Sequence, residues 1–238
     1  MSSWEWQADR WLAWARTPGH DSYWLFRDSF FDAIVPTPGR LTLEVGCGEG
    51  RVARDLAQRG HTVVALDASP TLVALAAAAD PGGHYVPGDA AALPFPDGAF
   101  DTVVAYNSLM DVADMPAAVH EVSRVLEPGG HLCVCVTHPT ADAGKFQSKE
   151  PDAPFVIPGS YLGRHRFEDS FERDDLEITF SGWRYSLEEY ALALEDAGLL
   201  IERLREPAAP AAALTVRPGY ERWQRLPNFL HLRAVKVV

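Results

Sequence analysis

Residues 44–50 have the sequence EVGCGEG, and this short stretch decides the fold. It follows an apolar run at residues 41–45 and precedes a helical pattern at residues 51–59. Gly46, Gly48 and Gly50 stand at alternate positions, where the absence of a Cβ lets the backbone turn sharply and approach a ligand closely. The free N–H groups at the start of the following helix favour a carboxylate or phosphate. The stretch therefore predicts a ligand-binding turn between a strand and a helix.

On both sides of this turn the sequence alternates between strand and helix patterns. We expect strands at residues 41–45, 62–66, 84–87, 101–106, 132–137, 199–204 and 230–237, and helices at residues 51–59, 71–79, 115–126 and 186–197. Ser69 and Ser186 are expected helix N-caps, the second with Glu189 as its capping-box partner, and residues 128–130 are an expected turn. Repeated β-α-β units predict an α/β, Rossmann-like three-layer sandwich, in which ligands bind beyond the carboxyl ends of the strands.

The two flanks of this regular region are predicted to cover the ligand site. Residues 4–16 have the pattern of an amphipathic helix, residues 23–35 are rich in aromatic side chains, and residues 138–182 are irregular, with many Pro and Gly. Long irregular segments within a compact domain are usually functional covers. We therefore expect one domain over residues 1–238, divided into an N-terminal helical lid (1–39), a cofactor-binding core (40–137), an acceptor-lid insertion (138–182) and a C-terminal helix with two strands (183–238).

The composition narrows the classes of partner. The net charge of −12 argues against binding a nucleic acid, since a protein that grips phosphates usually carries a basic stripe. The three cysteines, Cys47, Cys133 and Cys135, form no CxxC pair, so we expect reduced thiols, no disulfide framework and no metal site. We find no signal-peptide pattern and no run of about 18 apolar residues that could span a bilayer. We expect a cytoplasmic protein without membrane contact, either monomeric or homodimeric.

Two aspartates follow later strands and extend the ligand site. Asp67 ends the second strand, where a carboxylate can accept both hydroxyls of a ribose, although an aspartate there could also merely cap the next helix. Asp89 and Ala90 close the third strand, where a side-chain oxygen can accept an adenine amino group, although an aspartate after Gly88 could also be a turn residue. Together with the glycine turn, these positions predict a site for an adenosine-containing cofactor.

At this point the chain resembles the class I S-adenosylmethionine-dependent methyltransferases, in particular the small-molecule group that includes ubiquinone and menaquinone methyltransferases. The matching words lie within residues 40–137: LEVGCGEG (43–50), VALDAS (64–69), GDA (88–90), LPF (93–95), FDTVV (100–104) and RVLEPGG (124–130). The resemblance implies a seven-stranded sheet with an antiparallel last strand at residues 230–237, and S-adenosylmethionine as the cofactor, released as S-adenosylhomocysteine.

The resemblance also assigns the residues around the cofactor. It implies that the three glycines face the methionine part, that Asp67 binds the ribose, and that Asp89 and Ala90 hold the adenine. The complete expected cofactor set is Glu44, Gly46, Cys47, Gly48, Gly50, Arg51, Asp67, Ala68, Asp89, Ala90 and Asn107. A nicotinamide-binding fold is the alternative, but its GxGxxG fingerprint needs the third glycine one place later than Gly50.

The acceptor site is expected where the strand ends meet the flanking segments. A base is needed only if the acceptor must lose a proton early, and the candidates for catalysis are His138, which leaves the fifth strand, Tyr23 and Asn107. His138 could equally be a structural or packing residue. The expected acceptor-binding residues are His20, Tyr23, Trp24, Tyr106, His138, Tyr161 and His165.

An aromatic lid favours a planar or apolar small molecule. The sequence therefore predicts methyl transfer to the oxygen, nitrogen or carbon of a small aromatic or apolar metabolite. An RNA or protein methyltransferase is a weaker alternative, because the chain is acidic and lacks an Asn/Asp-Pro-Pro-aromatic word after the fourth strand. A cofactor-binding protein without turnover is the third alternative.

Overall fold

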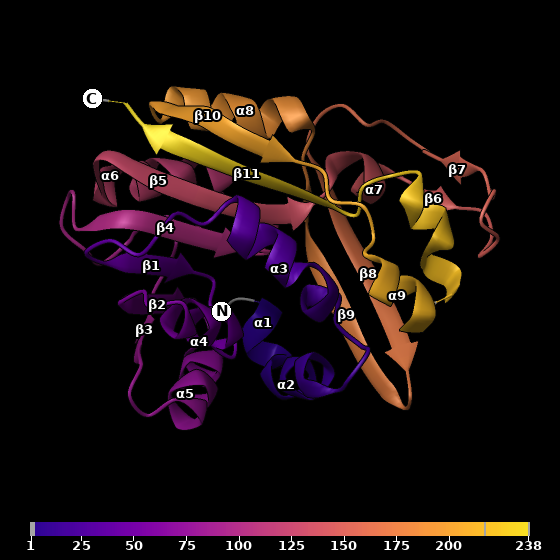
Figure 1. Ribbon diagram of the computed structural model, residues 1–238, viewed down its shortest axis with the longest axis horizontal. Helices are drawn as coiled ribbons and strands as arrows, with labels where there is room; N and C mark the ends of the chain where they lie inside the picture. Colours follow the sequence, from indigo (N-terminus) through magenta and orange to yellow (C-terminus); the bar gives the residue numbers. More distant parts are fainter. Residues whose placement is uncertain (1–2, 217, 238) are drawn as a thin grey trace.

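A seven-stranded sheet lies at the centre of the computed structural model, which describes residues 3–216 and 218–237 (Figure 1). Its strand order is β10-β11-β5-β4-β1-β2-β3. The strands are β1 (Thr42–Val45), β2 (Val63–Asp67), β3 (His84–Pro87), β4 (Phe100–Tyr106), β5 (Leu126–Thr137), β10 (Leu199–Arg205) and β11 (Phe229–Lys236). β1 to β5 pair in parallel, whereas β11 runs antiparallel to both β5 and β10. The predicted Rossmann-like class and the antiparallel last strand are both confirmed.

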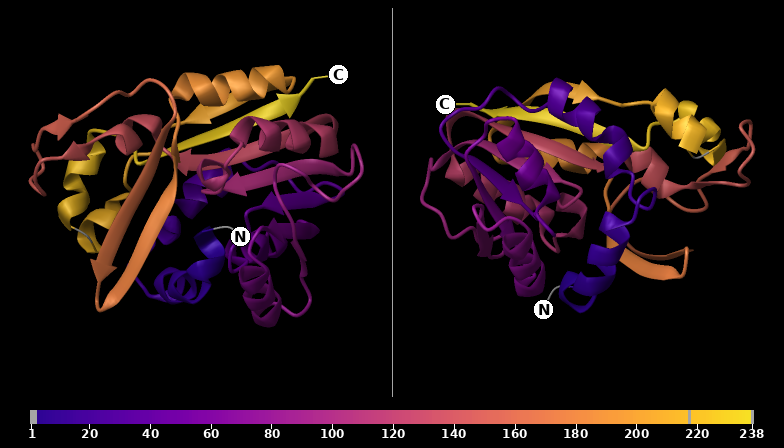
Figure 2. Two further views of the ribbon diagram at one scale, coloured as in Figure 1. Left: turned by 180° about the vertical axis from the view of Figure 1, so that it is seen from behind. Right: turned by 60° about the horizontal axis from the view of Figure 1, so that its bottom comes forward.

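Helices cover both faces of this sheet, because neighbouring residues on the central strands point to opposite sides. Val103 and Val134 pack in one apolar cluster with residues of α6 and α8, while Val104 and Cys133 pack in another with residues of α3 and α4. Figure 2 shows α6 and α8 from behind, on the face opposite α3. The helices of the two layers are α3 (Tyr23–Ala33), α4 (Arg51–Gln58), α5 (Pro70–Ala79), α6 (Met115–Val125) and α8 (Leu187–Asp196).

The expected helix caps are present, but the turn expected at residues 128–130 lies inside a strand. The Ser69 hydroxyl accepts a hydrogen bond from the Leu72 N–H, and Ser186 and Glu189 form the capping box of α8. β5 begins at Leu126 rather than at residue 132, so the expected turn at residues 128–130 lies within the strand. Phe100 pairs with Leu126 and Thr102 with His131, which shows that these residues bulge out while the strand pairing continues on either side.

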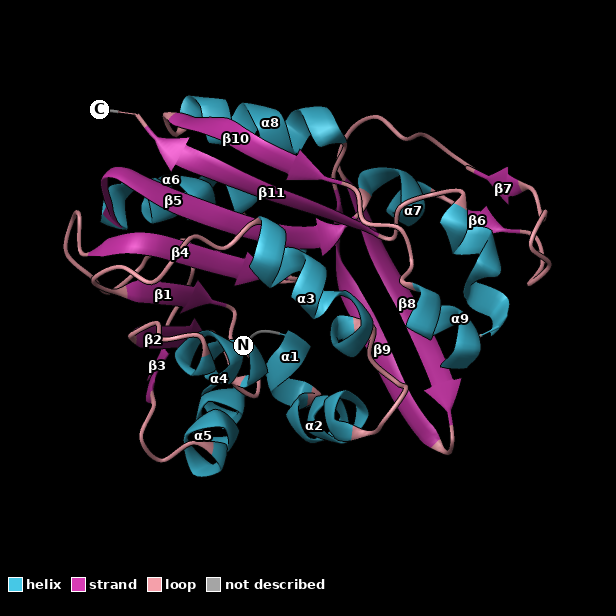
Figure 3. Cartoon of the chain, in the orientation of Figure 1, coloured by secondary structure: helices cyan, strands magenta, loops and turns pink. Residues whose placement is uncertain are grey.

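Residues 138–182 are far more regular than the sequence suggested, and this expectation is corrected. The segment contains α7 (Pro139–Ala143), β6 (Lys145–Phe146), β7 (Phe155–Val156) and β8 (His165–Arg173), and β8 forms a long hairpin with β9 (Leu176–Arg184) (Figure 3). Its two turn residues, Asp174 and Asp175, have φ of 50° and 62°, which suits a tight hairpin turn. β8 is largely exposed, so its sequence lacks the apolar pattern of a buried strand.

The hairpin lies beside the N-terminal helices, beyond the carboxyl ends of the central strands (Figures 1 and 2). The helix expected at residues 4–16 is interrupted at Gln7 into α1 (Ser3–Trp6) and α2 (Ala8–Arg16), and the Gln7 side chain accepts a hydrogen bond of 3.0 Å from the Thr179 N–H of β9. The Phe180 ring contacts Trp4, Trp11 and Trp14 edge to face. We refer to α1, α2 and the β8–β9 hairpin as the lid.

Three short elements complete the chain: η1 (Leu109–Asp111) follows β4, and α9 (Ala211–Val216) and η2 (Pro218–Gln224) precede β11. No helix in the described part of the chain has the length and apolar character needed to cross a membrane.

The capping box of α8 can be tested with two neighbouring glutamates. Glu189 accepts hydrogen bonds from the backbone N–H and the hydroxyl of Ser186, whereas Glu188 is exposed in the same helical turn. Both substitutions to alanine remove a negative charge near the helix N-terminus, so their difference isolates the cap. We expect Glu189→Ala to lower the free energy of unfolding by about 1 kcal/mol more than Glu188→Ala. Equal losses in urea denaturation would contradict the capping assignment.

Candidate cofactor and acceptor cleft

A cleft of about 1200 Å³ opens where the carboxyl ends of β1, β2, β4 and β5 meet the lid. One end is lined by the glycine turn and by the residues that follow β2 and β3. The lid lines the part that we call the aromatic end, with Trp4, Phe167, Phe180 and Trp183. The two parts adjoin at Trp11, whose indole nitrogen would lie 3.2 Å from a Cβ on Gly48. Small-molecule sites usually measure about 300–1000 Å³, so this cleft has room for two ligands side by side.

The glycine turn packs tightly against the residues that follow β4. Gly46 has φ of 76°, and its N–H donates a hydrogen bond of 2.8 Å to the Leu66 carbonyl. A Cβ on Gly46 would lie 2.3 Å from the Ser108 Cβ, and the Ser108 hydroxyl donates to the Val45 carbonyl at 2.6 Å. Only glycine combines this backbone conformation with so close an approach.

Asp67 connects the glycine turn to the start of α5. Its Oδ2 accepts a hydrogen bond of 2.7 Å from the Gly48 N–H, and its Oδ1 accepts one of 2.8 Å from the Ser69 N–H. Burial raises the pKa of Asp67, and these two N–H donors oppose the rise. The carboxylate lines the cleft, so its remaining lone pairs could accept hydrogen bonds from a ligand.

Two buried charged side chains in the cleft each have an atom without a partner. Glu44 is 1% exposed, and its Oε2 has no hydrogen-bond donor. Burial, together with the nearby charge of Asp67, raises the pKa of Glu44 well above its usual value. Arg51 pairs with Asp21 at 2.9 Å, but its buried Nη1 makes no hydrogen bond. Buried polar atoms that have no partner among the described residues are costly. Glu44 and Arg51 together therefore fit a ligand that carries both an ammonium and a carboxylate group.

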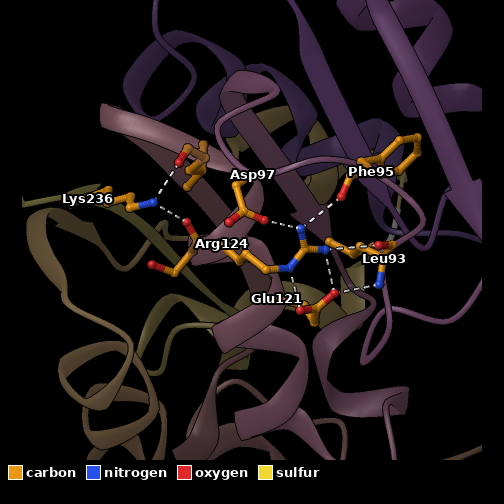
Figure 4. A network of polar contacts seen from close by, with 8 residues as sticks. Leu93, Phe95, Asp97, Glu121, Arg124 and Lys236 are labelled. Carbon is orange, nitrogen blue, oxygen red and sulfur yellow. Dashed lines mark hydrogen bonds and ion pairs between the residues drawn. The ribbon is translucent and has the colours of Figure 1, made fainter.

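A network around Arg124 holds the segment that follows β3. The guanidinium donates hydrogen bonds to the carbonyls of Leu93 and Phe95 and pairs with Glu121 and Asp97 (Figure 4). Glu121 in turn accepts a hydrogen bond from the Leu93 N–H at 2.8 Å. This network anchors the segment to α6, and the same segment begins with Asp89 and Ala90, which line the cleft.

Most of the predicted cofactor residues come together in this cleft. The lining includes Glu44, Gly46, Cys47, Gly48, Arg51, Asp67, Ala68, Asp89, Ala90 and Asn107. Gly50 is not in this lining set. It is the N-cap of α4, and a Cβ there would lie 2.9 Å from the Tyr85 ring. Gly50 therefore shapes the turn on the side that faces Tyr85.

The predicted acceptor residues are more dispersed. His20 and Tyr106 line the cleft, whereas Tyr161 and His165 line a separate cavity of about 220 Å³. Trp24 is 47% exposed and packs on Arg27. The structure thus brings together two of the seven residues expected to bind the acceptor, His20 and Tyr106, in the cleft lining.

Tyr23 and His138, two of the predicted catalytic residues, are not among the residues that line the cleft. Tyr23 is fully buried beneath Arg51, and its hydroxyl donates to Asp55 at 2.5 Å. His138 uses both ring nitrogens: Nδ1 accepts from the Thr140 N–H at the start of α7, and Nε2 lies 2.8 Å from Glu206. The alternative of a structural histidine describes its surroundings better.

Two aspartates that were not among the predicted site residues also line the cleft. Asp111 ends η1, and burial, with a smaller contribution from the charges of Asp67 and Asp142, raises its pKa to about 8. Asp142 lies in α7 with its carboxylate 3.6 Å from Arg184, and burial raises its pKa to about 6. Each lies only a few residues beyond the end of β4 or β5, and that position is the signal that could have identified them.

The strand order, the glycine turn and the acidic residue at the end of β2 define a Rossmann-like fold of the methyltransferase type. Residues 43–134 match a family model described as a methyltransferase domain. A crystal structure of an S-adenosylmethionine-dependent methyltransferase from Mesorhizobium loti superimposes with a TM-score of 0.71 at 25% identity, covering 90% of this chain and 98% of that one. The chain therefore has the fold of the class I S-adenosylmethionine-dependent methyltransferases and is similar to them over its core.

Two curated relatives match part of the chain. A demethylmenaquinone methyltransferase from Beutenbergia cavernae is 39% identical over 145 residues, which is 60% of this chain and 55% of the relative. A malonyl-[acyl-carrier protein] O-methyltransferase from Serratia marcescens is 36% identical over 110 residues, or 46% of this chain and 42% of the relative. The chain thus matches about half the length of these relatives.

The close approach at Gly46 gives a testable prediction with a matched control. Gly198 also has a positive φ, 71°, but a Cβ there would meet nothing within 4 Å. An alanine at either position strains the backbone, whereas only Gly46→Ala also collides with Ser108. In chemical denaturation we expect Gly46→Ala to lose about 1–3 kcal/mol more than Gly198→Ala. Similar losses would show that the turn has room to relax.

Proposed function

We propose that this protein transfers the methyl group of S-adenosylmethionine to a small aromatic or apolar acceptor. The observation that carries the proposal is a single cleft whose polar end, with unpaired groups of both charges, continues into an aromatic end beneath the lid. The similarity to S-adenosylmethionine-dependent methyltransferases supports S-adenosylmethionine as the cofactor. The charge and the aromatic lining of the cleft support a small aromatic or apolar acceptor.

The polar end fits each part of the cofactor. Arg51 would bind its carboxylate through the free Nη1, and Glu44 would accept from its ammonium group. Asp67 would accept from the ribose hydroxyls, while Asp89 and Ala90 would border the adenine. When bound, the cofactor supplies an electrophilic methyl group. The task of the chain is then to align the acceptor with that group and to exclude water.

The aromatic end favours a compact acceptor over a macromolecule. Phe180 contacts three lid tryptophans, and Arg173 at the hairpin tip donates to the Gly19 carbonyl at 2.7 Å, so the lid lies across the cleft. A net charge of −12 opposes binding of RNA. One relative is a demethylmenaquinone methyltransferase and another a malonyl-[acyl-carrier protein] O-methyltransferase, and an acceptor of the first kind suits an aromatic cleft better.

Methyl transfer from radiolabelled S-adenosylmethionine tests the proposed function. The purified protein is incubated with a small-molecule extract, with RNA and with a protein fraction. We expect label only in the small-molecule fraction. Label confined to RNA or protein would replace the proposed acceptor class, and cofactor binding without label in any fraction would indicate a protein without turnover.

The role of Asp67 can be measured without knowing the acceptor. Asp67→Ala should weaken S-adenosylmethionine at least tenfold in calorimetry, since charge-assisted hydrogen bonds to the ribose are worth roughly 1.5–3 kcal/mol. Asp152→Ala makes the same charge change at an exposed position and serves as the control. An affinity equal to that of the control would refute the assignment, provided that the melting temperature of each variant shows it to be folded.

A further inference from the structure

Asp111 stands at the junction between the cofactor end of the cleft and the lid. It ends η1, directly after β4 and the cleft residues Asn107 and Ser108. The Trp4 indole donates a hydrogen bond of 2.9 Å to its Oδ2. Its Oδ1 has no hydrogen-bond donor among the described residues and faces Gly182 of β9, where a Cβ would approach to 3.0 Å. A Cβ at position 182 would also lie 2.7 Å from the Met110 carbonyl oxygen, so glycine allows β9 to pack closely against η1 beside Asp111.

No cation in the described part of the chain forms an ion pair with Asp111. The nearest acidic groups that influence it are Asp67 after β2 and Asp142 on α7. Arg184 of β9 is shared by Asp142 and Asp169, at 3.6 Å and 2.8 Å, and Arg166 of β8 also borders the cleft. Burial and the two acidic neighbours keep the pKa of Asp111 near 8, while the Trp4 N–H lowers it. A partly buried carboxyl group without a cation partner and with a pKa near 8 exchanges between its two forms near neutral pH, and its ionised form is suited to accept a proton.

A second polar group lines the same cleft. Tyr106, at the end of β4, is 6% exposed, and its hydroxyl lies beside the Cys135 thiol. The lining around these groups is aromatic, with Trp4 and Phe180 in contact at 6.0 Å between ring centroids. An acceptor that fills this space would therefore place an aromatic or apolar body against the rings and a polar group towards the carboxylate.

We propose that Asp111 is a catalytic residue that binds an N–H or O–H group of the acceptor and takes its proton. The inference rests on the proposed function. With a hydroxyl acceptor, the reacting complex is the one in which Asp111 is ionised. The oxygen bonds to the methyl carbon as the carbon–sulfur bond breaks, the sulfur keeps that electron pair, and the hydroxyl proton moves to the carboxylate. With an amine, Asp111 first takes a proton from the ammonium form, and the free nitrogen pair then attacks the methyl carbon. Each route ends with a neutral thioether and a protonated Asp111.

Three matched probes test this assignment: 2-phenylethylamine, 2-phenylethanol and ethylbenzene, which share one aromatic body. Their binding is measured by calorimetry on protein saturated with S-adenosylhomocysteine. We expect the amine or the alcohol to bind at least tenfold more tightly than ethylbenzene. Asp111→Leu should reduce that preference to below threefold, whereas Asp9→Leu, at an exposed position of α2, should preserve it.

Calorimetry in two buffers of different ionisation enthalpy separates the two acceptor chemistries. At pH 7 the amine should release a proton from Asp111 as the carboxylate pairs with the cation, and the alcohol should not. A preference for the amine with proton release identifies an amine site, and a preference for the alcohol without release identifies a hydroxyl site.

Three results would overturn the assignment. Ethylbenzene could bind as tightly as both polar probes, all three probes could fail to bind, or the preference could be unchanged in Asp111→Leu. If wild-type protein fails to bind S-adenosylhomocysteine, the proposed function itself fails. If the product binds normally to wild type and to Asp111→Leu but the probes show no preference, only the role of Asp111 is lost.

Discussion

The pairing of Asp67 with two backbone N–H groups is the interaction on which the rest of the site depends. Through Gly48 and Ser69 it joins the turn after β1 to the turn after β2, so both adopt one arrangement relative to the strand ends. Ser69 caps α5, and the glycine turn leads into α4, so the starts of both helices are set by the same carboxylate. A group that organises the backbone in this way is also well placed to meet a ligand, because it is held in one orientation before binding.

The lid extends this arrangement to the far end of the cleft. Glu5 of α1 accepts hydrogen bonds from Ser69 and Thr71, next to Asp67, while the adjacent Trp4 donates to Asp111. Trp11 of α2 stacks on Arg51, and Gln7 binds the hairpin through Thr179. Two short helices therefore touch the residues after β2, the residues after β4, the start of α4 and the hairpin. The position of the N-terminal segment is thereby coupled to both ends of the cleft.

The departures from the sequence-based expectations have identifiable physical causes. Tyr23 and His138 have the chemistry of catalytic groups, but the Tyr23 hydroxyl is taken by Asp55 and both His138 ring nitrogens are engaged. The hairpin at residues 165–184 was missed because β8 is largely exposed and therefore polar. Asp111 and Asp142 appear in the sequence as ordinary polar residues near helix starts, and it is burial in the folded chain that raises the pKa of each.

The sequence alone predicted the alternating strands and helices of the core and the glycine turn, and the resemblance carried by its motifs implied the antiparallel last strand. The core elements depend on local pattern: apolar periodicity, glycine positions and caps lie within a few residues of one another along the chain. Tertiary structure decided the acceptor end, because its groups come from parts of the chain that are far apart in sequence, among them α1, η1, α7 and the β8–β9 hairpin. Which of those side chains face the cleft depends on how the lid packs across it, and no local pattern records a contact such as Trp4 with Asp111, which lie 107 positions apart.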